Sequence, residues 1–142
     1  MGPVKGVSMP GKVTTNRINH VTVMVKDTAC AMKFYNDLLG IKQIESQVPN
    51  ANITWLQLEN GVMVHLIESP EAPAKPSNVH NAFEVENFAE TKRVLKESGY
   101  PVLREGVRFD GQCYLFVNDP DGNSVEFCTT SGYAPAPPRP AK

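Results

Sequence analysis

The order of predicted elements repeats once along this chain, and this repeat limits the possible folds more than any other feature. Each half is predicted to form a strand, a helix and three further strands, over residues 17–68 and 79–133. One offset of about sixty residues relates three pairs of landmarks in the two halves. These pairs are His20 with His80, Gly40 with Gly99, and His65 with Glu126. The sequence therefore predicts an internal duplication of one βαβββ module.

The first module opens on residues 18–25, whose alternation and β-branched side chains are typical of a strand. Asp27 or Thr28 can cap the following helix, and Gly40 can end it. The apolar residues at helical spacing are Ala31, Phe34, Tyr35 and Leu38. Short strands are then expected at 41–47, 52–58 and 62–68.

The second module follows the same order. Its first strand is expected at 79–85, Asn87 with Glu90 resembles a capping box, and Gly99 closes the helix. The remaining strands are expected at 101–105, 112–118 and 124–128. The last two are joined through Asp-Pro-Asp-Gly-Asn at 119–123, where Pro and Gly favour a tight turn.

Chain length limits these two modules to one domain, because 142 residues leave room for a single core. Proline-rich segments lie outside the predicted elements. We therefore expect a flexible arm at 1–16, a proline-rich linker at 69–78 and a disordered proline-rich tail at 134–142.

The composition limits the kinds of partner that the protein can bind and the cellular compartment in which we expect it. Fourteen Lys and Arg against fifteen Asp and Glu leave no basic field for nucleic acid. No apolar run approaches the roughly 20 residues that cross a bilayer, and the start has no signal-peptide pattern. Three cysteines, at no metal-like spacing, indicate reduced thiols. We expect a cytoplasmic protein with a small-molecule substrate and with neither a nucleic-acid nor a membrane partner.

Four polar residues at matching places in the two modules form the candidate site. His20 and His80 lie in the first strand of each module, and His65 and Glu126 lie in the last. Strand periodicity places them opposite the side chains that pack on the helices. A pseudo-twofold relation would bring them to one centre, where three imidazoles and one carboxylate can bind a divalent ion.

Four segments resemble the vicinal oxygen chelate superfamily. They are residues 18–23, 34–41, 79–85 and 116–127, and the turn at 119–123 with Glu126 is the most specific part. This superfamily includes glyoxalase I, methylmalonyl-CoA epimerase, fosfomycin-resistance thiol transferases, extradiol dioxygenases and bleomycin-resistance proteins. The resemblance implies an α+β fold in which two βαβββ modules form a cupped, barrel-like mixed sheet with helices outside.

The resemblance also implies a ligand set, because family members carry metal ligands on the first and last strands of each module. By position these are His20, His65, His80 and Glu126, for one divalent ion: Ni, Zn, Mn, Co or Fe. His65 departs from the family pattern, since glyoxalase I usually has Glu there and the epimerase Gln. Glu126 and His65 are the expected catalytic residues, which would move a proton that the metal makes more acidic. Glu68 has the opposite strand parity and is the weaker ligand candidate.

Substrate contacts are expected from Gln112, Tyr114, Phe116 and Trp55. Phe116 would lie opposite Glu126 if the family's hairpin register holds, and Trp55 could instead cover the other face of its sheet. Three cationic residues could hold an anionic substrate, although we interpret them as solvated charge: Arg104, Arg108 and Lys75.

The leading functional hypothesis is a metal-dependent lyase or isomerase of the glyoxalase I type. Two histidines with one carboxylate also match the ligands of Fe(II) dioxygenases. A fosfomycin-type thiol transferase is a third candidate, and a bleomycin-type binder, which uses the fold as a groove without a metal, is a fourth. The resemblance favours a homodimer, and the cup could form within one chain or by exchange of modules between two.

Overall fold

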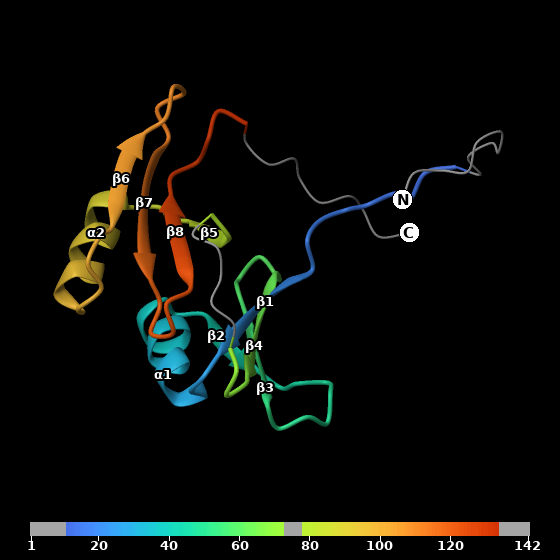
Figure 1. Cartoon of the computed structure of the whole chain (residues 1–142). Helices are drawn as coiled ribbons and strands as arrows, with labels where there is room; N and C mark the ends of the chain where they lie inside the picture. The colour runs from blue at the N-terminus through green and yellow to red at the C-terminus, as the bar shows by residue number, and fades with distance from the viewer. Residues whose placement is uncertain (1–10, 73–77, 134–142) are drawn as a thin grey trace.

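The computed structural model describes residues 11–72 and 78–133, which form two four-stranded sheets and their helices (Figure 1). The first module contains β1 (His20–Val25), α1 (Thr28–Met32), η1 (Lys33–Leu38), β2 (Lys42–Ile44), β3 (Ile53–Gln57) and β4 (Met63–Glu68). The second contains β5 (His80–Glu84), α2 (Phe88–Glu97), β6 (Arg104–Val107), β7 (Cys113–Asn118) and β8 (Ser124–Cys128). The predicted order of elements is confirmed in both halves.

Both sheets are mixed and have the same topology. Their strand orders are β1-β4-β3-β2 and β5-β8-β7-β6. In each sheet the first strand pairs in parallel with the last, and the other neighbours are antiparallel. The predicted α+β class is confirmed, with sheets that are cupped but not closed into a barrel. No helix in the described ranges is long and apolar enough to cross a membrane.

Local sequence signals set the helix ends. The Asp27 side chain accepts a hydrogen bond from a first-turn amide of α1 at 3.2 Å, and Asn87 accepts one from the Glu90 amide at 3.0 Å. Each cap satisfies a backbone donor that the helix leaves unpaired. Gly40 and Gly99 follow the helices with φ of 70° and 91°, where a Cβ would be strained.

Several boundaries differ from the prediction. The expected strand at 41–47 shrinks to Lys42–Ile44, because the Ser46 hydroxyl and the Val48 backbone bond locally instead of continuing the ladder. The strand expected from 101 begins at Arg104, since Pro101 has no amide to donate. Residues 1–10, 73–77 and 134–142 lie outside the described residues, and with them most of the predicted arm, part of the linker and the whole tail.

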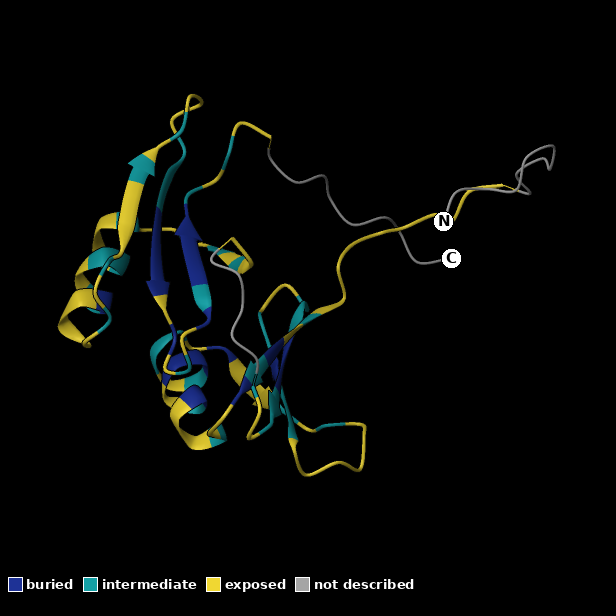
Figure 2. Ribbon diagram, viewed as in Figure 1, coloured by how far each residue is buried: buried dark blue, intermediate teal, exposed yellow. Residues whose placement is uncertain are grey.

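One hydrophobic core joins the two modules. It contains Phe34 and Tyr35 from η1 together with the inward residues of both sheets, among them Leu66 and Leu115. Figure 2 shows buried residues along β7 and β8, whereas β6 lies exposed at the outer edge. The inward faces of the sheets are therefore used for packing, and their opposite faces remain for a site.

The turn between β7 and β8 connects the modules by hydrogen bonds. Tyr35 Oη donates to Asp119 Oδ2 at 2.7 Å, and Asn123 Nδ2 donates to the Met24 carbonyl at 3.0 Å. Asp119 also accepts from Asn123 and from two backbone amides of its own turn. We call Tyr35, Asp119, Asn123 and the Met24 carbonyl the inter-module latch. The turn predicted from its Pro and Gly thus also fixes the first module against the second.

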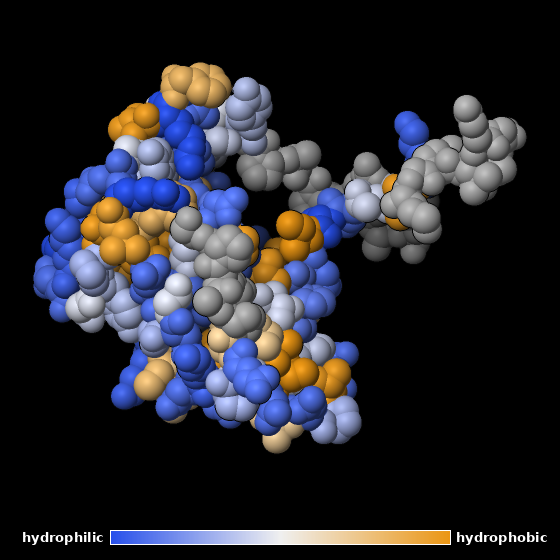
Figure 3. All heavy atoms as spheres, viewed as in Figure 1, coloured by the Kyte–Doolittle hydropathy of each residue, from blue (hydrophilic) through white to orange (hydrophobic). Residues whose placement is uncertain are grey.

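Apolar side chains gather at the tip of the β6–β7 hairpin, at the top of the view in Figure 3. Val107 and Phe109 there are 68% and 91% exposed. Val107 and Phe109 thus form a small exposed apolar group at this tip.

Candidate metal and substrate site

Three stacked rings occupy the open face of the first sheet. Trp55 on β3 lies directly opposite His65 on β4, with ring centroids 4.2 Å apart and planes 11° apart. His20 on β1 stacks on His65 at 4.1 Å and 18°. The neighbours Val64 and Leu66 point the other way, into the core. Two predicted ligands therefore come together, and Trp55 lies beside them rather than on the opposite face.

His65 is the buried member of this stack, with 8% of its surface exposed. Its Nε2 atom has no hydrogen-bond partner among the described residues. Burial is the main cause that lowers the pKa of His65, and the neighbouring His20 lowers it further. The ring is therefore neutral near neutral pH, which is the form that binds metals. An unpartnered buried nitrogen is costly, so Nε2 fits the position of a metal ligand.

The orientation of His20 is set by the residue before it. Its Nδ1 atom lies 2.8 Å from Asn19 Oδ1. Because an amide oxygen only accepts, Nδ1 is the donor in this contact. Metal-binding histidines are commonly oriented by such a partner on the other nitrogen.

The open face of the second sheet holds the other two predicted ligands. His80 Nε2 lies 3.0 Å from Glu126 Oε1, and the Glu126 carboxylate is buried with 5% exposure. The second carboxylate oxygen accepts from Arg108 Nη2 at 3.2 Å. His80 Nδ1 lies 3.1 Å from the Asn78 carbonyl oxygen, so both ring nitrogens face an oxygen. Hydrogen bonds to basic groups thus compensate the buried carboxylate.

Phe116 lies directly opposite Glu126 across β7 and β8, as the expected hairpin register predicts. His80 packs edge to face against Phe116, with centroids 4.9 Å apart. The guanidinium carbon of Arg104 lies 4.1 Å from the centre of the same ring. The Phe116 ring therefore contacts both His80, a predicted ligand, and Arg104.

Tyr114 and Gln112 position Arg108. The Arg108 guanidinium carbon lies 4.1 Å from the Tyr114 ring centre, and Nη1 donates to Gln112 Oε1 at 3.2 Å. Gln112 in turn donates to the Thr129 carbonyl at 2.9 Å. Gly106 makes room for the tyrosine, because a Cβ there would lie 2.6 Å from Tyr114 Oη. Gln112 and Tyr114 thus reach the site through Arg108.

The interpretation of these arginines as solvated charge is wrong for Arg108, which is ion-paired and stacked. It is incomplete for Arg104, which is exposed but stacked on Phe116. The stacking depends on the register of β6 against β7, which pairs Arg104 with Phe116 and was not predicted from the sequence. Lys75 lies outside the described residues.

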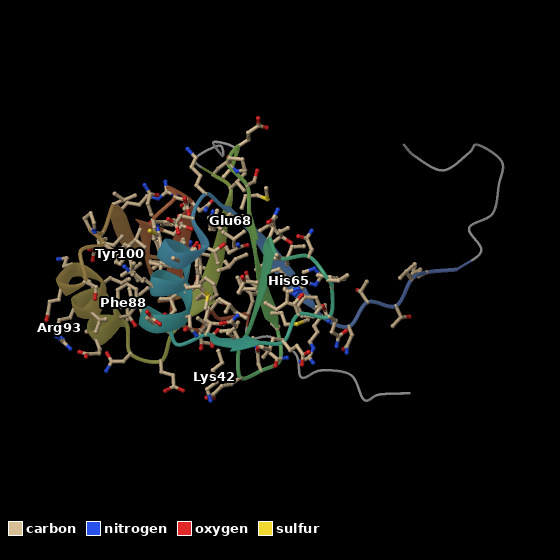
Figure 4. The ribbon with its side chains drawn as sticks, turned by 90° about the horizontal axis from the view of Figure 1, so that it is seen from below. Lys42, His65, Glu68, Phe88, Arg93 and Tyr100 are labelled. Carbon is tan, nitrogen blue, oxygen red and sulfur yellow. The ribbon has the colours of Figure 1, made fainter. Side chains whose placement is uncertain are left out.

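Glu68 caps a helix. Its Oε1 atom accepts from the Thr28 amide at 2.9 Å, at the N-terminus of α1. Figure 4 shows Glu68 apart from His65 along the same strand. The sequence places Glu68 on the opposite face of its strand from His65, and its role as a helix cap agrees with that placement.

The four predicted ligands thus lie as two pairs, one on each sheet. We call His20 with His65 the first half-site, and His80 with Glu126 the second half-site. Within residues 11–72 and 78–133, no three His, Cys, Asp or Glu side chains are grouped to hold a metal ion. A small cavity of about 110 Å³ lies between the modules beside His80. Thr22 and Tyr35 of the first module and Asn123 of the second are among the residues that line it.

The chain belongs to the Glyoxalase/Bleomycin resistance protein/Dioxygenase superfamily, whose family model matches residues 17–127. This match confirms the resemblance seen in the sequence. The name of the superfamily covers proteins of several activities, so membership alone defines a class and not a reaction.

Individual relatives agree with this assignment. Glyoxylase I 4 of Arabidopsis thaliana is 32% identical over 126 residues, which are 78% of this chain and 69% of the relative. A glyoxalase family protein from Enterococcus faecalis has a TM-score of 0.67 at 28% identity, over 79% of this chain and 96% of the other. Lactoylglutathione lyase from Agrobacterium tumefaciens shares the fold, with a TM-score of 0.66 at 21% identity over 82% and 95% of the two chains.

Proposed function

We propose that this protein is a divalent-metal-dependent lyase or isomerase of the glyoxalase I type. Its substrate would be a small molecule that chelates the metal through two neighbouring oxygens. The observation that carries this proposal is the buried Nε2 atom of His65, which stacks on His20 and has no partner among the described residues. The similarity to a plant protein named Glyoxylase I 4 supports the same reaction class.

The proposed ligands are His20, His65, His80 and Glu126. Three imidazoles and one carboxylate suit Ni, Zn, Mn, Co or Fe. When bound, such an ion acts as a Lewis acid that polarises the paired oxygens of a substrate and makes the adjacent proton more acidic. The carboxylate of Glu126 is already buried beside basic groups, so a cation can replace the compensation that they provide.

Two residues are proposed to carry the proton. Arg108 donates to Oε2 of Glu126, so Oε1, which lies beside His80, would be the oxygen that accepts the proton. His65 is the alternative base: its Nε2 atom, which has no partner among the described residues, could accept the proton only in a site where it is not a metal ligand. Trp55, Tyr114 and Phe116 would cover the substrate and exclude water.

We further propose that a homodimer joins the half-sites. Each chain carries one first half-site and one second half-site, on different sheets. In a dimer with twofold symmetry, the first half-site of each copy would lie against the second half-site of the other copy. The dimer would therefore contain two complete sites. The exposed apolar tip of the β6–β7 hairpin supports a surface between copies. The compartment is proposed to be the cytoplasm, in keeping with three free cysteines.

Metal analysis of protein purified without chelator tests the ligand set. We expect bound divalent metal in the wild type, a strong loss in His65→Ala and His80→Ala, and retention in Glu68→Ala, the control on the same strand as His65. Activity under anaerobic conditions with Ni, Co, Mn or Zn would support the lyase or isomerase. Activity only with Fe(II) and oxygen would replace it by a dioxygenase, and a wild type that binds no divalent metal would overturn the proposal.

Mixing two inactive variants tests the dimer. His65→Ala removes the first half-site and His80→Ala the second, so each homodimer should be inactive. A mixed dimer with sites across its interface contains one site built only from intact halves, and co-expression of the two chains should therefore restore metal binding and activity. Sites formed within single chains would show no such recovery.

A further inference from the structure

Arg104 differs from the other arginines in residues 11–72 and 78–133, because no carboxylate or carbonyl of those residues accepts a hydrogen bond from it. The others are Arg93, which pairs with Glu90 and Glu97, Arg108, which pairs with Glu126, and Arg17, which donates to the Asn60 carbonyl. Arg104 is instead held over the Phe116 ring at 4.1 Å. Its position is thus fixed by stacking, and its N–H groups remain available.

Arg104 shares one face of the sheet with the second half-site. It pairs across the sheet with Phe116, which pairs with Glu126. The three residues therefore lie in one row, and two strand spacings of about 10 Å separate the outer Cα atoms. A long arginine side chain lying over the central ring shortens that distance. The guanidinium is therefore within reach of a small molecule bound at Glu126.

The acids on this face do not compensate Arg104. Glu126 is shared between Arg108 and His80. Glu84 also faces this side, but it lies on the far strand β5 and accepts from Thr130 Oγ1 at 3.0 Å. A guanidinium stacked on a ring presents its planar N–H edge to an anion, and a carboxylate can accept two of those hydrogen bonds.

We propose that Arg104 binds a second carboxylate of the substrate. The substrate class is then a small 2-hydroxy or 2-oxo acid that bears another carboxylate beyond the group that chelates the metal. This inference rests on the proposed function, because the metal would hold the chelating end while Arg104 holds the other end. Arg104 would set specificity and orientation without taking part in proton transfer.

Three acids with the same chelating end test this proposal: lactate, malate and 2-hydroxyglutarate. The last two carry the second carboxylate. Binding to full-length protein loaded with Mn²⁺ can be followed by the fluorescence of Trp55, the single tryptophan of the chain, which stacks on His65. Electron paramagnetic resonance of free Mn²⁺ shows whether an acid removes the metal from the protein instead of binding to the protein-bound metal.

The wild type should bind at least one dicarboxylate about tenfold more tightly than lactate, as expected for a charge-assisted hydrogen-bonded pair. Arg104→Gln should bring this ratio close to one and leave the affinity for lactate unchanged, and Arg104→Lys should keep part of the preference. Arg93→Gln on the outer face of α2, far from His65 in Figure 4, should behave as the wild type.

Two results would contradict this inference, and they can be told apart from failure of the proposed function. Equal affinity of Mn²⁺-loaded wild type for the three acids, or an unchanged preference in Arg104→Gln, would overturn the carboxylate site alone. A wild type that takes up no Mn²⁺ would overturn the proposed function and this inference together.

Discussion

Asp119 is a buried carboxylate, 4% exposed, whose charge is compensated by hydrogen bonds from both modules. Its donors are Tyr35 Oη, Asn123 Nδ2 and the backbone amides of Asp121 and Asn123. Removing a donor leaves part of a buried charge unsatisfied, which costs more than the loss of a hydrogen bond at the surface. The stability of the junction therefore depends on single atoms.

Tyr35→Phe removes one of these donors and keeps the ring in the core. We expect the free energy of unfolding to fall by about 2 kcal/mol, as for a hydrogen bond to a charged group. Urea denaturation followed by circular dichroism measures the loss. Tyr133→Phe is the matched control, because that side chain is exposed and should change stability little. Equal midpoints for the two variants would contradict the role of the Tyr35 hydroxyl.

The same tyrosine predicts a response to alkaline pH. Burial is the main cause that raises the pKa of Tyr35, with a further contribution from Asp119, and burial also raises the pKa of Tyr100. The unfolded chain therefore loses these protons first, and stability should fall as pH rises above about 10, the ordinary tyrosine value.

Phenolate absorbance and circular dichroism during an alkaline titration test this response. The signal of Tyr35 and Tyr100 should develop together with unfolding. Full ionisation of all four tyrosines in a chain that keeps its native circular dichroism would contradict the prediction.

At the scale of single elements, the sequence predicts most accurately what neighbouring residues decide. Asp27 and Asn87 cap their helices as expected, because a cap needs only a short side chain next to the first turn. The pairing of Phe116 with Glu126 follows from a short hairpin. The helix after β1 is less regular than expected. It becomes a π-helix over Lys33–Leu38, where the Leu39 amide bonds to the Phe34 carbonyl.

Glu68 offers a test at this scale, because a cap and a metal ligand respond differently to its removal. Glu68→Ala deletes the acceptor of the Thr28 amide, so we expect a loss of about 1 kcal/mol in the free energy of unfolding, as for other helix caps. Metal content should stay at the wild-type value. Thermal unfolding and metal analysis of the same sample measure both. A stable variant that has lost its metal would contradict the capping role.

At the scale of the whole molecule, the spacing of the two half-sites could not be predicted. The offset between modules identifies matching positions but not the distance between them. That distance depends on contacts such as Tyr35 with Asp119, which are 84 residues apart in sequence and combine two polar residues with no local signal. Metal ligation by the four residues remains a prediction. The stacking of Arg104 and Arg108 likewise depends on the register of paired strands.

Asn123→Ala tests the connection between modules, because Asn123 bonds both Asp119 and the Met24 carbonyl. We expect backbone amides of β1 and of the β7–β8 turn to exchange with solvent about tenfold faster, while those of β3 change little. Hydrogen exchange with mass spectrometry measures this pattern. Asn60→Ala, which removes a bond within the β3–β4 turn, is the control. Unchanged exchange in β1 would show that the core alone holds the modules.

The inter-module latch also implies an order of assembly during synthesis. β4 completes the first sheet at Glu68, so every strand of that sheet can pair before the second module has been translated. Tyr35 has been translated by that time, but Asp119, which accepts the hydrogen bond from its hydroxyl, belongs to the turn before β8. Until β8 leaves the ribosome, the first module must therefore remain folded without the hydrogen bonds of the inter-module latch. Only then can the two halves act as one molecule.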